Sequence, residues 1–296
     1  MLTLYSYPTL FGVADNNGYG LKVFAFLKLT GVSFRHEHIF DASQAPRSQL
    51  PYIVDDDDTV GDSETILAYV TQKYRLTIDA ALSPAQRTTN LLIIRTLDDL
   101  YWVMSYSRWK DRRYWHAFRD AMLREHPILT EEGLGKAQEF NSKRYYYQGI
   151  GRYDPDAAMA RGLADLGALA NLLPASGYLH GAEPTSIDAS IYGFIANIYF
   201  YDIDTPLKQF VTTHDTSSGT AAPFMRPSTS SPDALALAQW SGAIGLLHSA
   251  DTSMHADGAG HILDAGDSFQ HFTTAKAIRI SAADMGGGKI NFASRT

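Results

Sequence analysis

The sequence predicts an α/β domain followed by an all-α domain, and two observations carry this prediction. Within residues 1–77, segments that alternate apolar and polar residues, as strands do, are interspersed with segments of helical spacing. From residue 84 to residue 214, amphipathic helical segments follow one another, separated by Gly and Pro. With 296 residues, 45% of them hydrophobic, the chain is long enough to bury two cores.

The first domain is expected to contain four strands and two helices. Pro8 ends the first strand, and Gly31 ends the first helix after a run of apolar residues at helical spacing. Four consecutive aspartates, residues 55–58, separate two short strands and predict the turn of a hairpin. The expected strands cover residues 2–7, 32–40, 52–54 and 59–61, and the expected helices cover 21–29 and 63–74. This order of elements is a thioredoxin-like arrangement.

The second domain is expected to be entirely helical. Ser83 and Pro84 begin a long amphipathic helix, because serine caps and proline suits the first helical position. Thr185 and Asp188 are spaced as a capping box, which predicts that another helix begins there. Further helices are expected near 111–125, 131–148, 154–173 and 186–203.

Two short segments of the first domain can together hold the amino-acid end of a peptide-like ligand. In the first, residues 49–53, Leu50 precedes Pro51, and a proline after an extended residue can be cis. The backbone N–H and C=O before the proline then face solvent instead of a sheet. In the second, residues 61–66, Ser63 offers a hydroxyl at a helix start that attracts a carboxylate, and Asp62 can face an ammonium.

These segments resemble the glutathione site of glutathione S-transferases, where a residue before a cis-proline and an acidic residue followed by serine hold the tripeptide. The capping box resembles the one that opens the buried helix of their helical domain. The resemblance covers about residues 1–213, and residues 45–53, 97–102 and 106–109 are similar to the metaxin/failed-axon-connections-like branch. It implies that glutathione is the co-substrate, a role in which Leu50 and Pro51 orient its backbone and Asp62 and Ser63 hold its γ-glutamyl end.

The resemblance also implies a hydrogen-bond donor that keeps the glutathione thiol ionised. In serine- and cysteine-type members the donor lies five residues before the lysine of a Leu-Lys-Val segment, which here gives Asn17. An asparagine amide can donate to sulfur but cannot act as a nucleophile, so disulfide reduction by a protein thiol is excluded. Asn17 can equally be a helix cap. Tyr5, Ser6 and Tyr7 are rival donors, and alignment on Pro8 selects Ser6 among them.

Aromatic and basic residues of the long helix are expected to line the pocket of the electrophile. They are Tyr101, Trp102, Tyr106 and Arg108. Aromatic side chains form the apolar walls of many ligand pockets, but at this spacing they also serve as core residues. Arg108 can alternatively pair with an acid. Residues 143–147 form a basic and aromatic cluster for which a solvated helix end or packing is expected.

Composition excludes several other functions. The chain has no cysteine, so disulfides, thiolate metal sites and a cysteine nucleophile are absent, and no metal is expected. The net charge of −7 argues against a nucleic-acid partner. There is no apolar run long enough to span a membrane and no signal-peptide pattern, so a cytoplasmic location is expected.

The expected function is therefore that of a glutathione S-transferase-like protein, which binds glutathione and adds its thiolate to a small electrophile. The family resemblance also implies a homodimer. The alternative is a non-catalytic binding or adaptor protein with the same fold, which the absence of serine or cysteine at position 17 favours.

Residues 215–296 differ from the rest of the chain and predict an aberrant or disordered tail. They contain no Tyr and no Glu, and they are rich in Ser, Thr, Ala and Gly. GC-rich codons for residues 216–229, read in a shifted frame, give a string of helical periodicity that resembles the final helix of the family. A frameshift near codon 215 is one hypothesis for the tail, and resequencing of the gene tests it.

Overall fold

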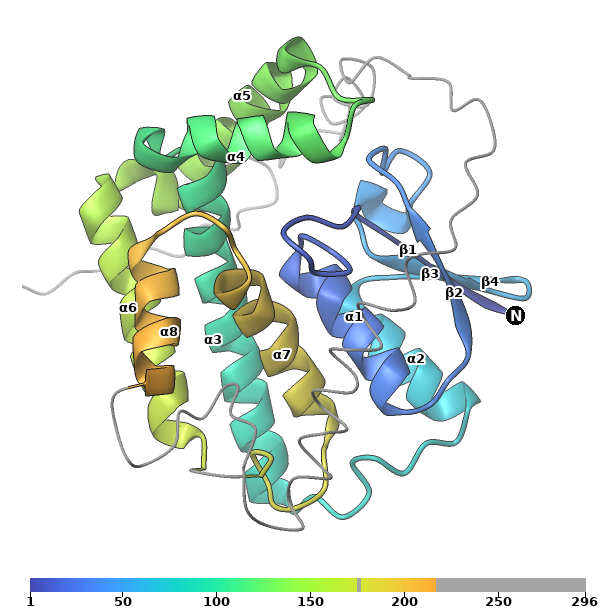
Figure 1. The fold of residues 1–296 in the computed structure, drawn as a ribbon. Helices are drawn as coiled ribbons and strands as arrows, with labels where there is room; N and C mark the ends of the chain where they lie inside the picture. The colour runs from blue at the N-terminus through green and yellow to red at the C-terminus, as the bar shows by residue number, and fades with distance from the viewer. Residues whose placement is uncertain (175–176, 217–296) are drawn as a thin grey trace, which may run out of the picture.

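A computed structural model of the protein describes residues 1–174 and 177–216. A four-stranded sheet with two helices comes first, and six helices follow (Figure 1). The predicted fold class, a thioredoxin-like domain followed by a helical domain, is confirmed. Apart from residues 215 and 216, the predicted tail lies outside the described residues, and the domain boundaries at 77, 84 and 214 stay predictions.

The sheet has the strand order β2-β1-β3-β4, in which β1 is parallel to β2 and antiparallel to β3. Its strands are β1 (Leu2–Ser6), β2 (Phe34–His38), β3 (Tyr52–Asp55) and β4 (Asp58–Gly61). Helices α1 (Gly18–Leu29) and α2 (Ser63–Lys73) cover the face of the sheet that is turned toward the helical domain (Figure 1). Leu2 and Leu4 alternate with half-buried residues along β1 and point into this core, as the period of two predicts.

The helical domain contains one helix more than the sequence predicted. It comprises α3 (Pro84–Trp109), α4 (Arg112–Glu125), α5 (Glu131–Gln148), α6 (Pro155–Leu172), α7 (Ser186–Tyr199) and α8 (Pro206–Thr216). The helix expected over 186–203 ends at Tyr199, and α8 begins at Pro206. Proline disfavours a helical conformation at the residue before it and suits the first turn of the next helix, so the chain breaks between the two.

The capping box at the start of α7 is confirmed. The Asp188 carboxylate accepts hydrogen bonds from the Thr185 backbone N–H and hydroxyl, both at 2.8 Å, and from the Leu179 N–H at 2.9 Å. Every residue from Ile187 to Ile198 is buried. Helix α7 therefore forms the centre of the molecule, with a helix of the first domain on one side and helices of its own domain on the other (Figure 1).

The two domains meet where α1 packs against α7. At Gly193 the helices come so close that a Cβ atom there would lie 2.6 Å from the Lys22 backbone nitrogen and 2.7 Å from the Gly18 carbonyl oxygen. Ala189 and Ala196, one helical turn to either side, belong to the same apolar core as the sheet. Small residues on α7 thus allow the close approach that fixes the first domain against the second.

Candidate functional site

The segments singled out in the sequence converge on one edge of the sheet. The antiparallel register pairs Tyr5 of β1 with Tyr52 of β3, so Tyr7, just after β1, lies beside Leu50, just before β3. Gly61, the last residue of β4, also pairs with Tyr52, so α2 begins at the same edge.

The start of α1 is held at this edge too. The backbone N–H and the side-chain amide of Asn16 both donate to the Pro8 carbonyl oxygen, each at 3.3 Å. Asn17, the next residue, caps α1. The candidate site is therefore surrounded by the segment after β1, the Leu50–Pro51 segment, the loop before α1, and the N-termini of α1 and α2.

Leu50 and Pro51 are joined by a cis peptide bond, as the sequence suggested. The Leu50 side chain is buried and packs with Ala45 and Tyr52 in a small apolar cluster that Tyr7 also contacts. The side chain of Leu50 thus anchors the segment. The role of its backbone toward a ligand stays a prediction.

Asp62, and not Ser63, caps α2. Its carboxylate accepts from the Thr65 backbone N–H at 3.1 Å and from the Thr65 hydroxyl at 3.0 Å, and the Arg47 guanidinium lies 3.7 Å away. Ser63 is the first helical residue and is buried. Helix α2 thus begins at Ser63, where the sequence placed its start. The exposed Asp62 carboxylate places a negative charge at the helix start, and the Ser63 hydroxyl is left for other contacts.

Lys22 supplies a cation beside Ser63 that the sequence analysis did not assign to the site. Its Nζ donates to the Ser63 hydroxyl oxygen at 3.4 Å and forms an ion pair with Glu64. Burial lowers the pKa of Lys22 to about 8, while the carboxylates of Asp98 and Asp62 oppose that change. A lysine inside the apolar run of α1 was the signal in the sequence, because a lysine is rarely buried without a partner.

Asn17 is a helix cap whose side chain also reaches the second domain. Its Oδ1 accepts from the Tyr19 backbone N–H at 3.0 Å, and its Nδ2 donates to the Tyr101 hydroxyl oxygen at 3.4 Å. The capping role considered in the sequence is thus present. The amide donor lies at the domain junction, where a sulfur held by the Leu50 segment can compete for it, and that second role stays a prediction.

Ser6 and Tyr7 differ sharply in their surroundings. Ser6 is fully buried, and its Oγ shares a hydrogen bond with His36 Nε2 over 2.7 Å, inside the sheet. Tyr7 is half-buried, and in the described part of the chain its hydroxyl makes no hydrogen bond. Burial raises the pKa of Tyr7 to about 12, so the hydroxyl keeps its proton at neutral pH and can donate. The geometry therefore favours Tyr7 over Ser6 as the donor from β1.

The four residues predicted to line the electrophile pocket do not share one face of α3. Successive residues of a helix are turned by about 100°, so Tyr101 and Arg108 point one way and Trp102 and Tyr106 another. Tyr101 contacts the first domain through Asn17 and packs on Tyr19, with the rings tilted and their centroids 4.8 Å apart. Trp102 and Tyr106 face α5 instead, where both pack on Tyr145.

Arg108 is a structural link and not a pocket residue. It is buried, and its two terminal nitrogens donate to the Asn16 carbonyl oxygen at 2.6 Å and the Asn197 carbonyl oxygen at 2.8 Å. Its guanidinium also lies over the Tyr201 ring, 4.7 Å from the centroid. Arg108 thereby ties the loop before α1 to α7. The pairing with an acid, which the sequence left open as an alternative, is replaced by bonds to carbonyl oxygens, including the Asn197 side-chain oxygen at 3.4 Å.

Asp15 places a buried carboxyl group directly behind the site. Its Oδ1 accepts from the Asn17 backbone N–H at 2.7 Å. Burial raises the pKa of Asp15 to about 8, against the effect of its hydrogen bonds and of Arg108. The side chain is tightly enclosed, since a Cβ atom at Gly20 would lie 1.6 Å from its Oδ2.

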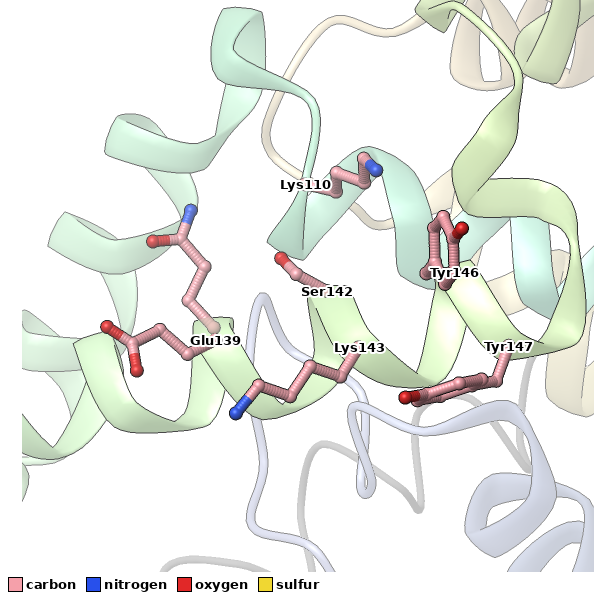
Figure 2. A pocket seen from close by; sticks show the side chains of 7 residues that line it. Lys110, Glu139, Ser142, Lys143, Tyr146 and Tyr147 are labelled. Carbon is pink, nitrogen blue, oxygen red and sulfur yellow. The ribbon is translucent and has the colours of Figure 1, made fainter.

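A hollow that is separate from the candidate site lies on α5 (Figure 2). It has a volume of about 440 Å³ and is lined by polar and aromatic side chains of α5, including Lys143 and Tyr147, together with Lys110. Residues 143–147 therefore divide between different surroundings: Lys143, Tyr146 and Tyr147 are exposed and Tyr145 is buried in the core. The hollow does not include any predicted site residue.

Within residues 1–174 and 177–216, no group of three or more His, Asp or Glu side chains could hold a metal ion. None of the described helices is both long and apolar enough to cross a membrane.

Comparison with known proteins gives matches in both domains. The family model "Glutathione S-transferase N-terminal domain" matches residues 19–114, and "Glutathione S-transferase, C-terminal domain" matches residues 162–216. An isoprene-epoxide–glutathione S-transferase of Rhodococcus sp. (strain AD45) is 31% identical over 207 residues, which are 67% of this chain and 87% of that protein. Failed axon connections of Drosophila melanogaster is 23% identical over 214 residues, which are 66% of this chain and 50% of that protein.

Solved structures are also similar to this chain. A glutathione S-transferase III in its apo form is 15% identical and gives a TM-score of 0.46, covering 87% of this chain and 99% of its own. A glutathione transferase family member from Pseudomonas fluorescens pf-5, with two glutathione molecules bound, is 15% identical with a TM-score of 0.44 and covers 67% of this chain and 77% of its own.

Proposed function

The chain belongs to the glutathione S-transferase family, and on that premise we propose that it binds glutathione and adds its thiolate to a small electrophile. The observation that carries the proposal is the convergence of the Leu50–Pro51 segment, the start of α2 and the Tyr7 and Asn17 donors on one edge of the sheet. A tripeptide with two carboxylates, an ammonium and a thiol matches this set of groups.

The γ-glutamyl end of glutathione has partners of suitable charge. The γ-glutamyl carboxylate is bound by the Ser63 hydroxyl and by the N–H groups at the start of α2, where the helix dipole favours an anion. The adjacent ammonium is bound by the exposed carboxylate of Asp62. The backbone of the cysteinyl residue pairs with Leu50, which places the thiol toward Tyr7 and Asn17.

The reaction requires that the thiol be held as a thiolate, because the thiolate is the nucleophile. The Tyr7 hydroxyl and the Asn17 amide donate hydrogen bonds to the sulfur and lower its pKa. Donors that are fixed before the reaction are the most effective, since they need no reorganisation. The Tyr7 hydroxyl is fixed by packing in the Leu50 cluster, and Asn17 is fixed as the cap of α1.

A small epoxide is the electrophile that we propose. The relative from Rhodococcus is named an isoprene-epoxide–glutathione S-transferase and is 31% identical to this chain. Tyr101, at the domain junction beside Asn17, contributes one wall for such a substrate.

The test is the conjugation of glutathione with styrene oxide, measured for the wild type and three variants. Tyr7→Phe and Asn17→Ala each remove one donor, and we expect kcat to fall by about 100-fold for Tyr7→Phe, a typical loss for one fixed donor. Tyr5→Phe is the matched control, because Tyr5 lies on β1 two residues before Tyr7 and its ring stacks on Tyr52. Wild-type activity in Tyr7→Phe with normal glutathione binding would refute the role of Tyr7.

A non-catalytic binding or adaptor protein is the second candidate function. The observation in its favour is that Asn17, which stands where serine- and cysteine-type relatives carry their donor, is already engaged as a cap and with Tyr101. Saturable glutathione binding together with no turnover of epoxides, aryl halides or alkyl halides would support this second candidate.

We also propose a homodimer in the cytoplasm, as expected of a glutathione S-transferase. Light scattering coupled to size-exclusion chromatography of the full chain measures the oligomeric state, and a monomer at micromolar concentration would contradict the proposal.

A further inference from the structure

Helix α5 carries a cation, Arg144, that lies against Trp102 of helix α3. The Arg144 guanidinium lies over the rings of Trp102 and Phe140, 5.4 Å and 5.8 Å from their centroids. Trp102 is next to Tyr101, whose hydroxyl accepts from Asn17. Arg144 is thus linked to the candidate thiolate donors through two neighbouring aromatic side chains.

The positive charge of Arg144 also acts on the donor from β1. Burial is the main cause of the raised pKa of Tyr7 and Tyr101 adds to it, whereas the charge of Arg144 opposes the rise. The charge of Arg144 thus acts across the boundary between the two domains. The hollow of Figure 2 lies on a different face of α5 and includes Lys143 but not Arg144.

Arg144 is not neutralised by a carboxylate in the described part of the chain. Its one hydrogen bond is to Asn141 Oδ1, at 3.2 Å, which directs the guanidinium without cancelling its charge. Arg113 and Arg161 of the same domain are both paired, with carboxylates at 2.6–2.8 Å. A half-buried arginine without an acidic partner attracts an anion, and its N–H groups form a planar fork suited to oxygen.

We propose that Arg144 binds the oxygen atom of the electrophile and stabilises the negative charge that develops on it when the glutathione thiolate adds. This inference rests on the proposed function and assigns its electrophile side: an apolar body against Trp102 and Phe140, and an oxygen toward the guanidinium. A small epoxide with an apolar substituent has both features.

The thiolate sulfur attacks an epoxide carbon and forms the C–S bond, while the C–O bond to that carbon breaks and its electron pair goes to the oxygen. The alkoxide, held by Arg144, then takes a proton from water. The thiol proton has already gone to solvent, so the sum is one thiol and one epoxide giving one hydroxy thioether.

The experiment compares Arg144→Met, Arg144→Lys and Lys143→Met with the wild type, all as full chains. Methionine keeps the length of the side chain but removes the charge, and lysine keeps the charge. Lys143→Met removes the same charge from the neighbouring position, whose side chain is exposed. The measurements are turnover of glutathione with styrene oxide, calorimetric binding of glutathione, the ultraviolet absorbance of the bound thiolate, and thermal unfolding as a check of folding.

The proposal predicts that Arg144→Met lowers kcat/KM for styrene oxide by about 100-fold. Glutathione affinity and thiolate absorbance should change by less than about threefold, Arg144→Lys should recover at least tenfold of the loss, and Lys143→Met should match the wild type. Wild-type turnover in Arg144→Met would overturn the proposal and leave the proposed function intact.

Other outcomes also decide the matter. An equal loss of turnover and of glutathione affinity would overturn the proposal, since Arg144 would then serve glutathione and not the electrophile. A folded wild type that binds no glutathione would refute the proposed function and this inference with it. If Arg144→Met does not fold, Arg144→Gln, which also removes the charge, takes its place: a loss of turnover without a loss of glutathione affinity supports the proposal, and wild-type turnover overturns it.

Discussion

The carboxyl group of Asp15 should make the fold less stable as the pH rises above neutral, and Asp15→Asn should remove that effect. The side chain is fully buried between β1 and α1, and Ser6, Tyr7, Asn17 and Arg108 are the groups that act on it. Asparagine keeps an oxygen acceptor for the Asn17 N–H but cannot ionise.

The magnitude follows from the difference between the folded and the unfolded chain. Burial raises the pKa of Asp15 from 3.8 to about 8. Between these values the folded state binds one more proton than the unfolded state, so the stabilisation is complete below 3.8 and is lost as the pH rises through 8. Each pH unit in this range lowers the free energy of unfolding by about 1.4 kcal/mol.

His36 has the opposite effect in part of this range. Burial lowers its pKa from 6.5 to about 3, so below 6.5 the unfolded state binds the additional proton. The two slopes cancel between 3.8 and 6.5, and the effect of Asp15 remains between 6.5 and 8. Over this interval it amounts to about 2 kcal/mol. Lys22, whose pKa is lowered to about 8, affects the free energy of unfolding only at pH values above this interval.

The assay is urea unfolding at several pH values from 6.5 to 8 for the wild type, Asp15→Asn and Asp57→Asn. Asp57 is exposed in the turn of the hairpin and serves as the control. We expect the free energy of unfolding to fall with pH about 2 kcal/mol further in the wild type and in Asp57→Asn than in Asp15→Asn. Parallel pH dependences of the wild type and Asp15→Asn would refute the reasoning, whatever the absolute stabilities.

Three further predictions concern stability and can be measured by urea unfolding at neutral pH. Arg108→Met should cost about 3 kcal/mol, because it leaves two buried carbonyl oxygens without their donors, whereas Arg152→Met should stay within about 0.5 kcal/mol; equal losses would contradict the structural role of Arg108. Gly193→Ala should cost about 1–3 kcal/mol by forcing α7 away from the backbone of α1, and a neutral effect would show that the helices are not in such close contact. Asp62→Ala should cost about 0.5–2 kcal/mol as the loss of a cap, and Ser63→Ala should cost less; a larger loss for Ser63→Ala would indicate that Ser63 is the cap.

Much of the fold could be predicted because its signals are local. The alternation along β1, the proline at the start of α3 and the capping box of α7 each depend on a few neighbouring residues. The break between α7 and α8 was missed, because the apolar spacing of α7 continues past Tyr199 and only Pro206, several residues on, marks the interruption. A periodic pattern locates a helix more reliably than it locates the end of one.

The candidate site, too, could be predicted from the sequence only where its signals are local. Leu50, Pro51, Asp62 and Ser63 could be placed together because strand pairing brings local motifs to one edge of a sheet. Which residue caps α2 could not be decided from the sequence, because both Asp62 and Ser63 are good caps and only the folded geometry distinguishes them.

The residues of the helical domain could be assigned to the site only in part from the sequence. Tyr101 and Trp102 are adjacent, but the rotation of α3 against its neighbours directs one to the first domain and the other to α5. Arg108 and Arg144 look alike in the sequence, yet one is tied to backbone carbonyls and the other has no acidic partner among the described residues. Such differences arise from tertiary packing, which a single sequence does not encode locally.

Calorimetric titration of glutathione into the full chain at neutral pH tests directly whether this edge of the sheet binds glutathione. We predict saturable binding with one site per chain, weakened about tenfold by Ser63→Ala, the loss expected for a hydrogen bond to a carboxylate, and unchanged by Asp57→Asn. A chain that unfolds cooperatively on heating, and is therefore folded, but gives no saturable heat with glutathione would contradict this prediction.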